Sequence, residues 1–150
     1  MIIYTDGSCL ANGKTNSKGG FGIVILDDSE NLIDTYAEFE ENTTNNRQEM
    51  KAIIWAIKHY GHNNLKIYSD SAYAVNTFSN WIYSWARNNW KKSDNQTPEN
   101  LDLVQEYYNL IMEENCYADL FIIKGHSGNK WNELADDLAT GRIVATWNTN

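Results

Sequence analysis

Asp6 is the first of several acidic residues in this 150-residue chain that call for an explanation. It lies inside the predicted strand Ile2–Ser8, where alternation places its side chain on the same face as Tyr4. A carboxylate on a half-buried strand face is costly unless a positive group meets it, and no lysine or arginine is nearby in the sequence. Two interpretations are open for Asp6 alone: a functional carboxylate, or a strand-end residue that caps a turn at Gly7-Ser8.

Asp70 and Glu49 each allow a functional and a local interpretation. Asp70 follows the predicted strand Leu65–Ser69 and precedes a predicted helix. Ligand sites gather at such strand ends, but an aspartate there is also a common helix N-cap. Glu49 falls in the first turns of the predicted helix Asn46–Tyr60 and borders its apolar face. Asn46 and Glu49 also have the spacing of a capping box.

Asp136 and Asp137 lie on the last predicted helix, Asn132–Ala139. They flank its apolar stripe on opposite sides, so periodicity does not choose between them, and a solvated pair is the local alternative. His126 lies in the polar loop Gly125–Lys130 before this helix, where it is either a proton carrier or a solvent-exposed histidine.

Taken together, these acids predict a metal centre, because two strands and two helices would bring them to one end of a sheet. Carboxylates so close raise one another's pKa, and divalent cations remove that conflict. Oxygen-only ligands favour Mg²⁺ or Mn²⁺ over zinc. A cluster that holds two such ions about 4 Å apart suits in-line displacement at a phosphodiester.

The elements that must position these residues follow the order βββαβααβα. Three short-linked strands at the start predict an antiparallel meander. We therefore expect an α/β (α+β) fold, with a mixed sheet covered by helices. The predicted strands are Ile2–Ser8, Phe21–Leu26, Leu32–Phe39, Leu65–Ser69 and Leu120–Ile123, and the predicted helices are Asn46–Tyr60, Ser71–Arg87, Leu101–Met112 and Asn132–Ala139.

Length and composition narrow the class of protein. The length is typical of one domain, and 42% hydrophobic with 13% aromatic residues excludes disorder as the default. The net charge of −8, from 12 basic and 20 acidic residues, argues against binding through a broad basic surface. The start of the chain has no signal-peptide pattern, and the longest apolar run is Ala52–Ile57. Two cysteines without metal-ligand spacing suggest reduced thiols. We expect a soluble, cytoplasmic protein.

Five motifs resemble, in order and spacing, the signatures of type 1 ribonuclease H. The resemblance runs from residue 1 to about residue 140. Any one motif arises easily by chance, whereas all of them in order form a specific signal. The motifs are Thr5-Asp6-Gly7-Ser8-Cys9, Thr43-Thr44-Asn45-Asn46-Arg47-Gln48-Glu49, Ser69-Asp70-Ser71-Ala72-Tyr73, Lys124-Gly125-His126-Ser127-Gly128 and Asn132-Glu133-Leu134-Ala135-Asp136.

The resemblance implies a single ribonuclease H domain over residues 1–150, with a five-stranded mixed sheet flanked by helices. It implies an endonuclease that hydrolyses the RNA strand of RNA–DNA hybrids, leaving 5′-phosphate and 3′-hydroxyl ends. Two Mg²⁺ ions, replaceable by Mn²⁺, would be held by Asp6, Glu49, Asp70 and Asp136. By this resemblance Asp6 bridges both ions, Asp136 rather than Asp137 is the fourth acid, and His126 assists proton transfer or product release.

The resemblance also implies contacts with the hybrid. Asn45 and Asn46 match groups that touch the minor groove, where 2′-hydroxyls distinguish RNA from DNA, and Cys9 matches a contact residue near the first acid. Asn12 and Thr44 match groups that grip a phosphate of the DNA strand. A protrusion around residues 81–100 matches a substrate-gripping element, with Trp81, Trp85, Lys91 and Lys92 as contacts, and a short tail follows residue 141. This protrusion is less basic than is usual in the family, and Ala72 replaces a frequent glutamine.

Two alternatives to an active ribonuclease H are open. One is a catalytically silent module that binds hybrids or a partner, although such a module would not need four clustered acids. The other is a DNA-directed nuclease of the same fold, which the motifs around Asn45 and His126 disfavour. We expect a monomer with no membrane contact and no protein partner.

Overall fold

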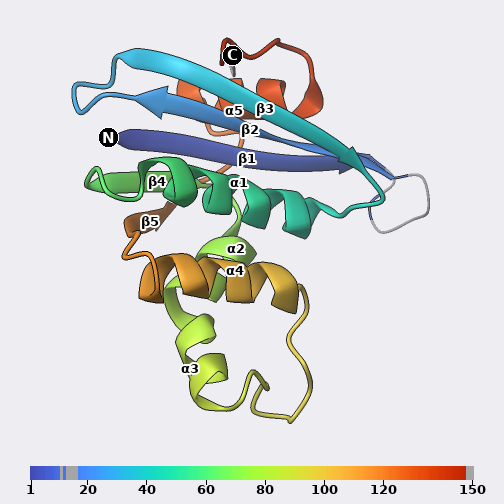
Figure 1. Ribbon diagram of the computed structural model, residues 1–150. Coiled ribbons are helices and arrows are strands. Elements are labelled where there is room, and N and C mark those ends of the chain that lie inside the picture. The colour runs from blue at the N-terminus through green and yellow to red at the C-terminus, as the bar shows by residue number, and fades with distance from the viewer. Residues whose placement is uncertain (11, 13–16, 148–150) are drawn as a thin grey trace.

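The computed structural model describes residues 1–10, 12 and 17–147, which form one mixed sheet with helices on both faces (Figure 1). The strand order is β3-β2-β1-β4-β5. β1 pairs antiparallel with β2, and β2 with β3, whereas β4 runs parallel to both β1 and β5. This confirms the predicted meander and fold class. The strands are β1 (Ile2–Leu10), β2 (Lys18–Leu26), β3 (Leu32–Glu41), β4 (Leu65–Ser69) and β5 (Ala118–Ile122).

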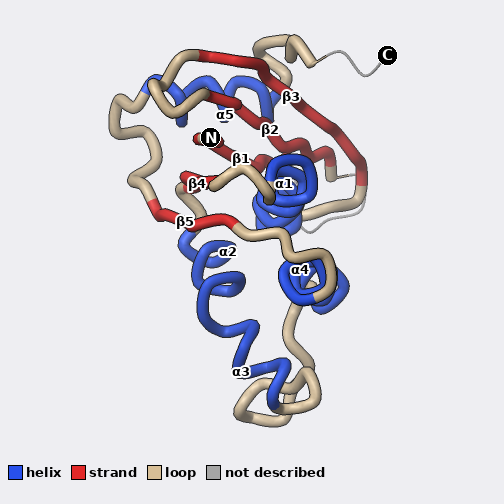
Figure 2. Tube along the Cα trace, turned by 60° about the vertical axis from the view of Figure 1, so that its left-hand side comes forward, coloured by secondary structure: helices blue, strands red, loops and turns tan. Residues whose placement is uncertain are grey.

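The helices divide between the two faces of the sheet. α1 packs on β1 and β2 from one face and contacts α4, while α5 packs on the same two strands from the other face (Figure 2). α2, a π-helical segment η1, and α3 then lead away from the sheet toward a long loop. The helices are α1 (Asn45–Tyr60), α2 (Ala72–Asn76), η1 (Thr77–Trp81), α3 (Ile82–Arg87), α4 (Leu101–Met112) and α5 (Lys130–Thr140).

The prediction of one continuous α-helix over Ser71–Arg87 is therefore wrong. The helix begins at Ala72 with Ser71 as its N-cap, and a π-helical turn at Thr77–Trp81 interrupts it. Apolar spacing does not report whether a turn closes its backbone hydrogen bonds at i+4 or at i+5, so it does not reveal the π turn. The second strand is also longer than predicted, because its glycine-rich start at Lys18 still pairs with β1. The fifth strand begins at Ala118 rather than Leu120.

Strand alternation divides the core into two layers. Ile3, Ile23 and Ile25 are fully buried in the layer that includes α1 and α4. Tyr4 and Val24 belong to the layer beneath α5. Because Asp6 follows Tyr4 by two residues, its side chain leaves β1 on the α5 side.

The chain that follows α5 returns to the far edge of the sheet. The Trp147 amide donates a hydrogen bond to the Thr35 carbonyl at 2.8 Å, and the Trp147 ring packs edge-on against Trp55 with centroids 5.3 Å apart. Thr146 and Trp147 therefore lie along edge strand β3, and the Trp147 ring contacts α1 from outside. Of the helices described, none is long and apolar enough to cross a membrane. Cys9 and Cys116 are both free thiols.

Candidate active site

Asp6, Glu49 and Asp70 meet near the end of β4, where it pairs with β1 in the interior of the sheet. One carboxylate oxygen from each lies within 4.8 Å of the other two. β1 and β4 are parallel neighbours that pair Thr5 with Ser69, so the residues that follow, Asp6 and Asp70, emerge side by side. Asp6 and Glu49 are buried and Asp70 is half-buried. Three of the four acids that the sequence predicted to gather therefore lie together.

Gly7 makes the approach of Glu49 possible. A Cβ atom at this position would lie 2.4 Å from the Glu49 amide nitrogen, so only glycine lets β1 and α1 pack this closely. The Gly7 amide donates to the Asp6 Oδ1 at 2.9 Å and to the Glu49 Oε1 at 2.8 Å. The Ser69 hydroxyl donates to the Glu49 Oε2 at 3.5 Å. These donors orient the acids without neutralising them.

The local interpretations of the three acids are wrong. β1 continues through Ser8 to Leu10, so Asp6 caps no turn. The N-cap of α1 is Thr44, whose hydroxyl accepts from the Arg47 amide, which excludes the capping box proposed for Asn46 and Glu49. The N-cap of α2 is Ser71 rather than Asp70.

Asp136, on α5, lies outside the group of three acids but interacts with Asp6. Asp136 lies within hydrogen-bonding reach of Asp6, and this contact contributes to raising the pKa of Asp6. Both α5 acids are held by one side chain, since Arg142 donates to the Asp136 Oδ2 at 2.6 Å and to the Asp137 Oδ1 at 2.9 Å. The pKa of Asp6 is thus raised by Glu49, by Asp70 and by Asp136 in addition to burial.

The electrostatics of the cluster are unfavourable without an added cation. Burial raises the pKa of Asp6, and the charge of Glu49 raises it further. Burial likewise raises the pKa of Glu49 and of Asp70. Within the described part of the chain, no lysine or arginine pairs with any of these three acids. Oxygen ligands that are close, buried and uncompensated fit a hard divalent cation.

His126 lies beside the cluster on the loop before α5. It is exposed, with φ of 55°, and its charge favours the ionised form of Asp70. Gly125 allows the loop to come this close, because a Cβ there would lie 2.7 Å from the Asp70 Oδ2. The predicted proton carrier is therefore near the cluster without being packed into it.

The predicted hybrid contacts at the start of α1 gather in one place. The Asn12 Oδ1 accepts from the Asn45 amide at 2.7 Å, and the Cys9 thiol donates to the Thr43 carbonyl at 3.4 Å. Asn45 and the adjacent Asn46 are exposed. Thr44 caps the helix beside them. These residues lie immediately before the helical turn that carries Glu49.

The predicted contacts on the protrusion form a second surface. The Trp81 and Trp85 rings lie 6.2 Å apart, and together with Lys91 they line a pocket of about 370 Å³. Lys91 donates to the Thr97 hydroxyl at 2.9 Å. Lys92 is half-buried in the same loop and does not line this pocket. Figure 1 shows that α3 and its loop extend from the sheet at the end opposite β3.

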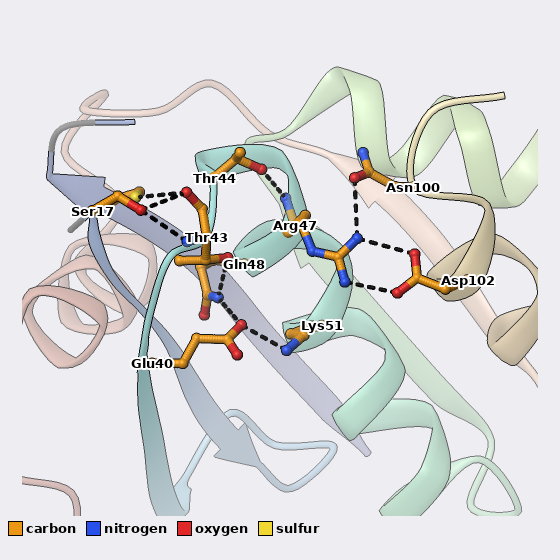
Figure 3. A network of polar contacts seen from close by, with 10 residues as sticks. Ser17, Glu40, Thr43, Thr44, Arg47, Gln48, Lys51, Asn100 and Asp102 are labelled. Carbon is orange, nitrogen blue, oxygen red and sulfur yellow. Dashed lines mark hydrogen bonds and ion pairs between the residues drawn. The ribbon is translucent and has the colours of Figure 1, made fainter. Parts of the chain in front are cut away.

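A charge network joins these two surfaces at the start of α1 (Figure 3). Arg47 donates to both oxygens of Asp102, at 3.0 and 2.7 Å, and to the Asn100 Oδ1 at 3.3 Å. Glu40 accepts from Lys51 and from Gln48, both at 2.6 Å. The α1 terminus is thereby tied to β3 and to the point where the protrusion loop enters α4.

Arg142 is the residue near the site that the sequence patterns did not single out. Motif matching stops at Asp136, and a single arginine six positions later carries no periodic signal. A local clue exists, because Gly141 ends α5 in a left-handed conformation with φ of 80° and turns the chain back on the helix. Ser69 and Gly7 were also missed as donors to Glu49, although both stand within quoted motifs.

Comparison with known proteins places the chain in a family. The family model for RNase H matches residues 1–143. A ribonuclease H of Thermoanaerobacter pseudethanolicus is 41% identical over 143 residues, which cover 94% of this chain and 88% of that protein. The crystal structure of LC9-RNase H1, a type 1 RNase H with the type 2 active-site motif, has a TM-score of 0.74 and 27% identity over 93% of this chain and 70% of that one. LC11-RNase H1 in complex with RNA/DNA hybrid has a TM-score of 0.67 and 22% identity over 93% of this chain and 94% of that one.

The fold and the acid cluster define a hydrolytic nuclease with a mixed five-stranded sheet. The chain belongs to the ribonuclease H family and is similar to its type 1 members.

Proposed function

We propose that this chain is an endonuclease that hydrolyses the RNA strand of RNA–DNA hybrids with the help of two Mg²⁺ ions. The observation that carries the proposal is the group of three uncompensated carboxylates within 4.8 Å, in a member of the ribonuclease H family. The substrate class is supported by LC11-RNase H1, whose fold this chain shares and whose structure holds an RNA/DNA hybrid.

Asp6, Glu49 and Asp70 would hold one ion, and Asp6 with Asp136 the other. The central position of Asp6 supports its shared role, because the other acids approach it from α1 and α5. Divalent ions at such a site supply an activated water and neutralise charge that develops at phosphorus. Mn²⁺ would substitute because it also accepts carboxylate oxygens.

The side chains would divide the remaining tasks. Glu49, whose carboxylate accepts from the Gly7 amide, would hold its ion in a fixed position. His126, exposed on its loop beside Asp70, would carry a proton toward the leaving 3′-oxygen or assist release of product. In-line attack of water on phosphorus opposite the 3′-oxygen, with cleavage of the P–O3′ bond, would leave 5′-phosphate and 3′-hydroxyl ends.

Two surfaces would bind the hybrid. Asn45, Asn46 and Cys9 lie beside the acids, where short polar groups reach 2′-hydroxyls across a shallow minor groove. Asn12 and Thr44, at the N-terminus of α1, would hold a phosphate of the DNA strand. The aromatic pocket of Trp81 and Trp85, with Lys91 and Lys92, would contact the DNA strand farther along the duplex.

A cleavage panel tests the proposal. Labelled RNA–DNA hybrid, double-stranded RNA, single-stranded RNA and double-stranded DNA are incubated with Mg²⁺, Mn²⁺ or EDTA. We expect metal-dependent loss of only the RNA strand of the hybrid, and its absence in Asp6→Asn. Asp119→Asn is the matched control, because Asp119 is an exposed acid on the outer strand β5. Its hydrogen-bond partner is the Tyr117 hydroxyl.

The alternatives give different results in the same panel. Intact hybrid under all metals, with equal retention of hybrid in EDTA, would favour a catalytically silent binding module. Cleavage of DNA alone would indicate a DNA-directed nuclease of the same fold. Equal activity of wild type and Asp6→Asn would contradict the site itself.

A further inference from the structure

Arg142 occupies a carboxylate that the proposed metal centre needs. Its Nη2 donates to the Asp136 Oδ2 at 2.6 Å, and its Nε donates to the Asp137 Oδ1 at 2.9 Å. Gly141, with φ of 80°, reverses the chain after α5 and directs Arg142 back over the last turns of that helix. The guanidinium therefore bridges two neighbouring acids in a planar, two-armed contact.

We propose that Arg142 is a built-in counter-ion of Asp136, which a divalent cation must displace before Asp136 can act as a ligand. The proposal rests on the proposed metal centre and concerns how readily its second position fills. Arg142 would thus set the cation concentration at which the centre becomes complete.

The distribution of charge supports this assignment. Within the described residues, Arg142 is the one lysine or arginine that pairs with any of the four acids Asp6, Glu49, Asp70 and Asp136. Among the described residues, the three acids that would hold the first ion have no lysine or arginine partner, so no such side chain must be displaced there. The second ion would compete with the guanidinium for Asp136.

Exposure indicates that the competition is reversible. The Arg142 side chain is 58% exposed and Asp136 is 25% exposed, so solvent screens their attraction. Asp137 explains why Arg142 nevertheless stays close, because it offers a second carboxylate that takes no part in the cluster.

Metal binding without nucleic acid tests the proposal directly. Mn²⁺ is titrated into the full chain at constant pH and ionic strength, and free Mn²⁺ is measured by electron paramagnetic resonance. We expect Arg142→Ala to tighten the weaker of two binding events by about two- to fivefold, the range that an exposed ion pair supports. The tighter event should not change. Arg142→Lys should give an intermediate value, because lysine keeps the charge and loses the planar fork.

Two controls separate a specific pair from a general charge effect. Lys130→Ala removes the same charge from the opposite end of α5, where Lys130 lies over the Trp131 ring at 4.5 Å. It should change the weaker event much less than Arg142→Ala. In an Asp136→Asn background, Arg142→Ala should have no further effect, because the carboxylate for which it competes is gone.

Three results would overturn the proposal: an unchanged or weakened second event in Arg142→Ala, an equal shift in Lys130→Ala, or a shift that persists in Asp136→Asn. If the chain binds two Mn²⁺ ions and neither affinity changes in Arg142→Ala, the proposed function still stands. A wild-type chain that binds no Mn²⁺ would contradict the metal centre of the proposed function as well.

Discussion

Two groups of charged residues lie within one helical turn of each other at the start of α1 and have opposite electrostatics. Glu49 belongs to the acid cluster, where burial raises the pKa of each of three carboxyls. Arg47, two residues earlier, belongs to the charge network of Figure 3, where every acid has a cationic partner. The start of α1 thus supplies residues both to a group of carboxylates without cationic partners and to a network in which each carboxylate has one.

The pKa values show the difference between the two groups. Hydrogen bonds from Arg47 lower the pKa of Asp102. Burial alone would raise the pKa of Glu40, but Lys51 and Gln48 outweigh it and the pKa is lowered. In the acid cluster nothing of the kind opposes burial at Asp6, so its pKa is raised. Carboxylates that have no cationic partner in the protein can bind a cation from solution.

The charge network stabilises the framework that the repulsion within the acid cluster strains. Arg47 and Lys51 anchor α1 to α4 and to β3, and between them the helix delivers Glu49 against Asp6. A repulsive site can persist only where the surrounding structure holds its members in place. The following experiments alter either the acid cluster or the charge network.

The largest expected effect is on the pH dependence of stability without metal. The cluster carboxyls have a folded pKa above their unfolded value near 4, so the native state binds more protons than the unfolded state above that pH. The free energy of unfolding should therefore fall as pH rises from 5 to 8, by up to about 1.4 kcal/mol per pH unit for each proton held. Urea denaturation in EDTA and in saturating Mg²⁺ measures this.

Mg²⁺ should flatten that slope, because the ions replace the protons. Added NaCl at matched ionic strength is the control, and it should leave most of the slope in place. The acids of the network do not interfere, since a lowered pKa contributes its change in stability below this pH window. Stability in EDTA that stays constant or rises from pH 5 to 8 would contradict the electrostatic account of the cluster.

Gly7→Ala should cause the next largest change. The new Cβ would lie 2.4 Å from the Glu49 amide nitrogen and 2.6 Å from the Gln48 carbonyl carbon, both of which belong to the backbone. We expect a loss of about 3 kcal/mol in the free energy of unfolding, because β1 and α1 must separate. Ser8→Ala, in the next position of β1, should stay within about 1 kcal/mol of wild type. A fully stable Gly7→Ala protein would refute the close approach.

Asp6→Asn should stabilise the metal-free protein while it abolishes cleavage. The amide keeps an oxygen that accepts from Gly7 and removes the repulsion with Glu49. We expect a gain of about 1–2 kcal/mol at pH 8, which fades toward pH 4 as the wild-type cluster becomes protonated. Thermal denaturation in EDTA at the two pH values measures it. An Asp6→Asn protein that is less stable than wild type at pH 8 would contradict the claim that repulsion among these acids destabilises the metal-free protein.

Asp102→Asn should have the smallest effect, of opposite sign. The side chain of Asp102 is 63% exposed, so its pair with Arg47 is screened and should contribute about 0.5 kcal/mol. Glu106→Gln removes the same charge from the next turn of α4 and should change stability less. Urea denaturation at pH 7, repeated at high salt, checks that the difference between the two variants shrinks. If Asp102→Asn were more stable than wild type, the ion pair with Arg47 would not stabilise the fold, and the network would not differ from the acid cluster in this respect.

Much of the architecture could be predicted from local patterns. The β4 and α4 bounds, Leu65–Ser69 and Leu101–Met112, coincide with the predicted ones because apolar periodicity and flanking polar residues mark both ends. The π turn at Thr77–Trp81 could not be predicted in this way, since it depends on how the segment packs against α4, where Phe78 stacks on Tyr107 with centroids 4.1 Å apart.

By itself, the sequence determined the residue types at the site, their order along the chain and their membership of a family of motifs. It did not decide between Asp136 and Asp137 by periodicity, nor between a cap and a functional acid at Asp70. The tertiary structure decided the second choice, because Ser71 caps α2 and Asp70 meets Asp6 and Glu49, and it adds an interaction of Asp136 with Asp6 to the first. It also placed Arg142 on Asp136. Sequence patterns report local preference, whereas charge compensation depends on distances between segments far apart in the chain.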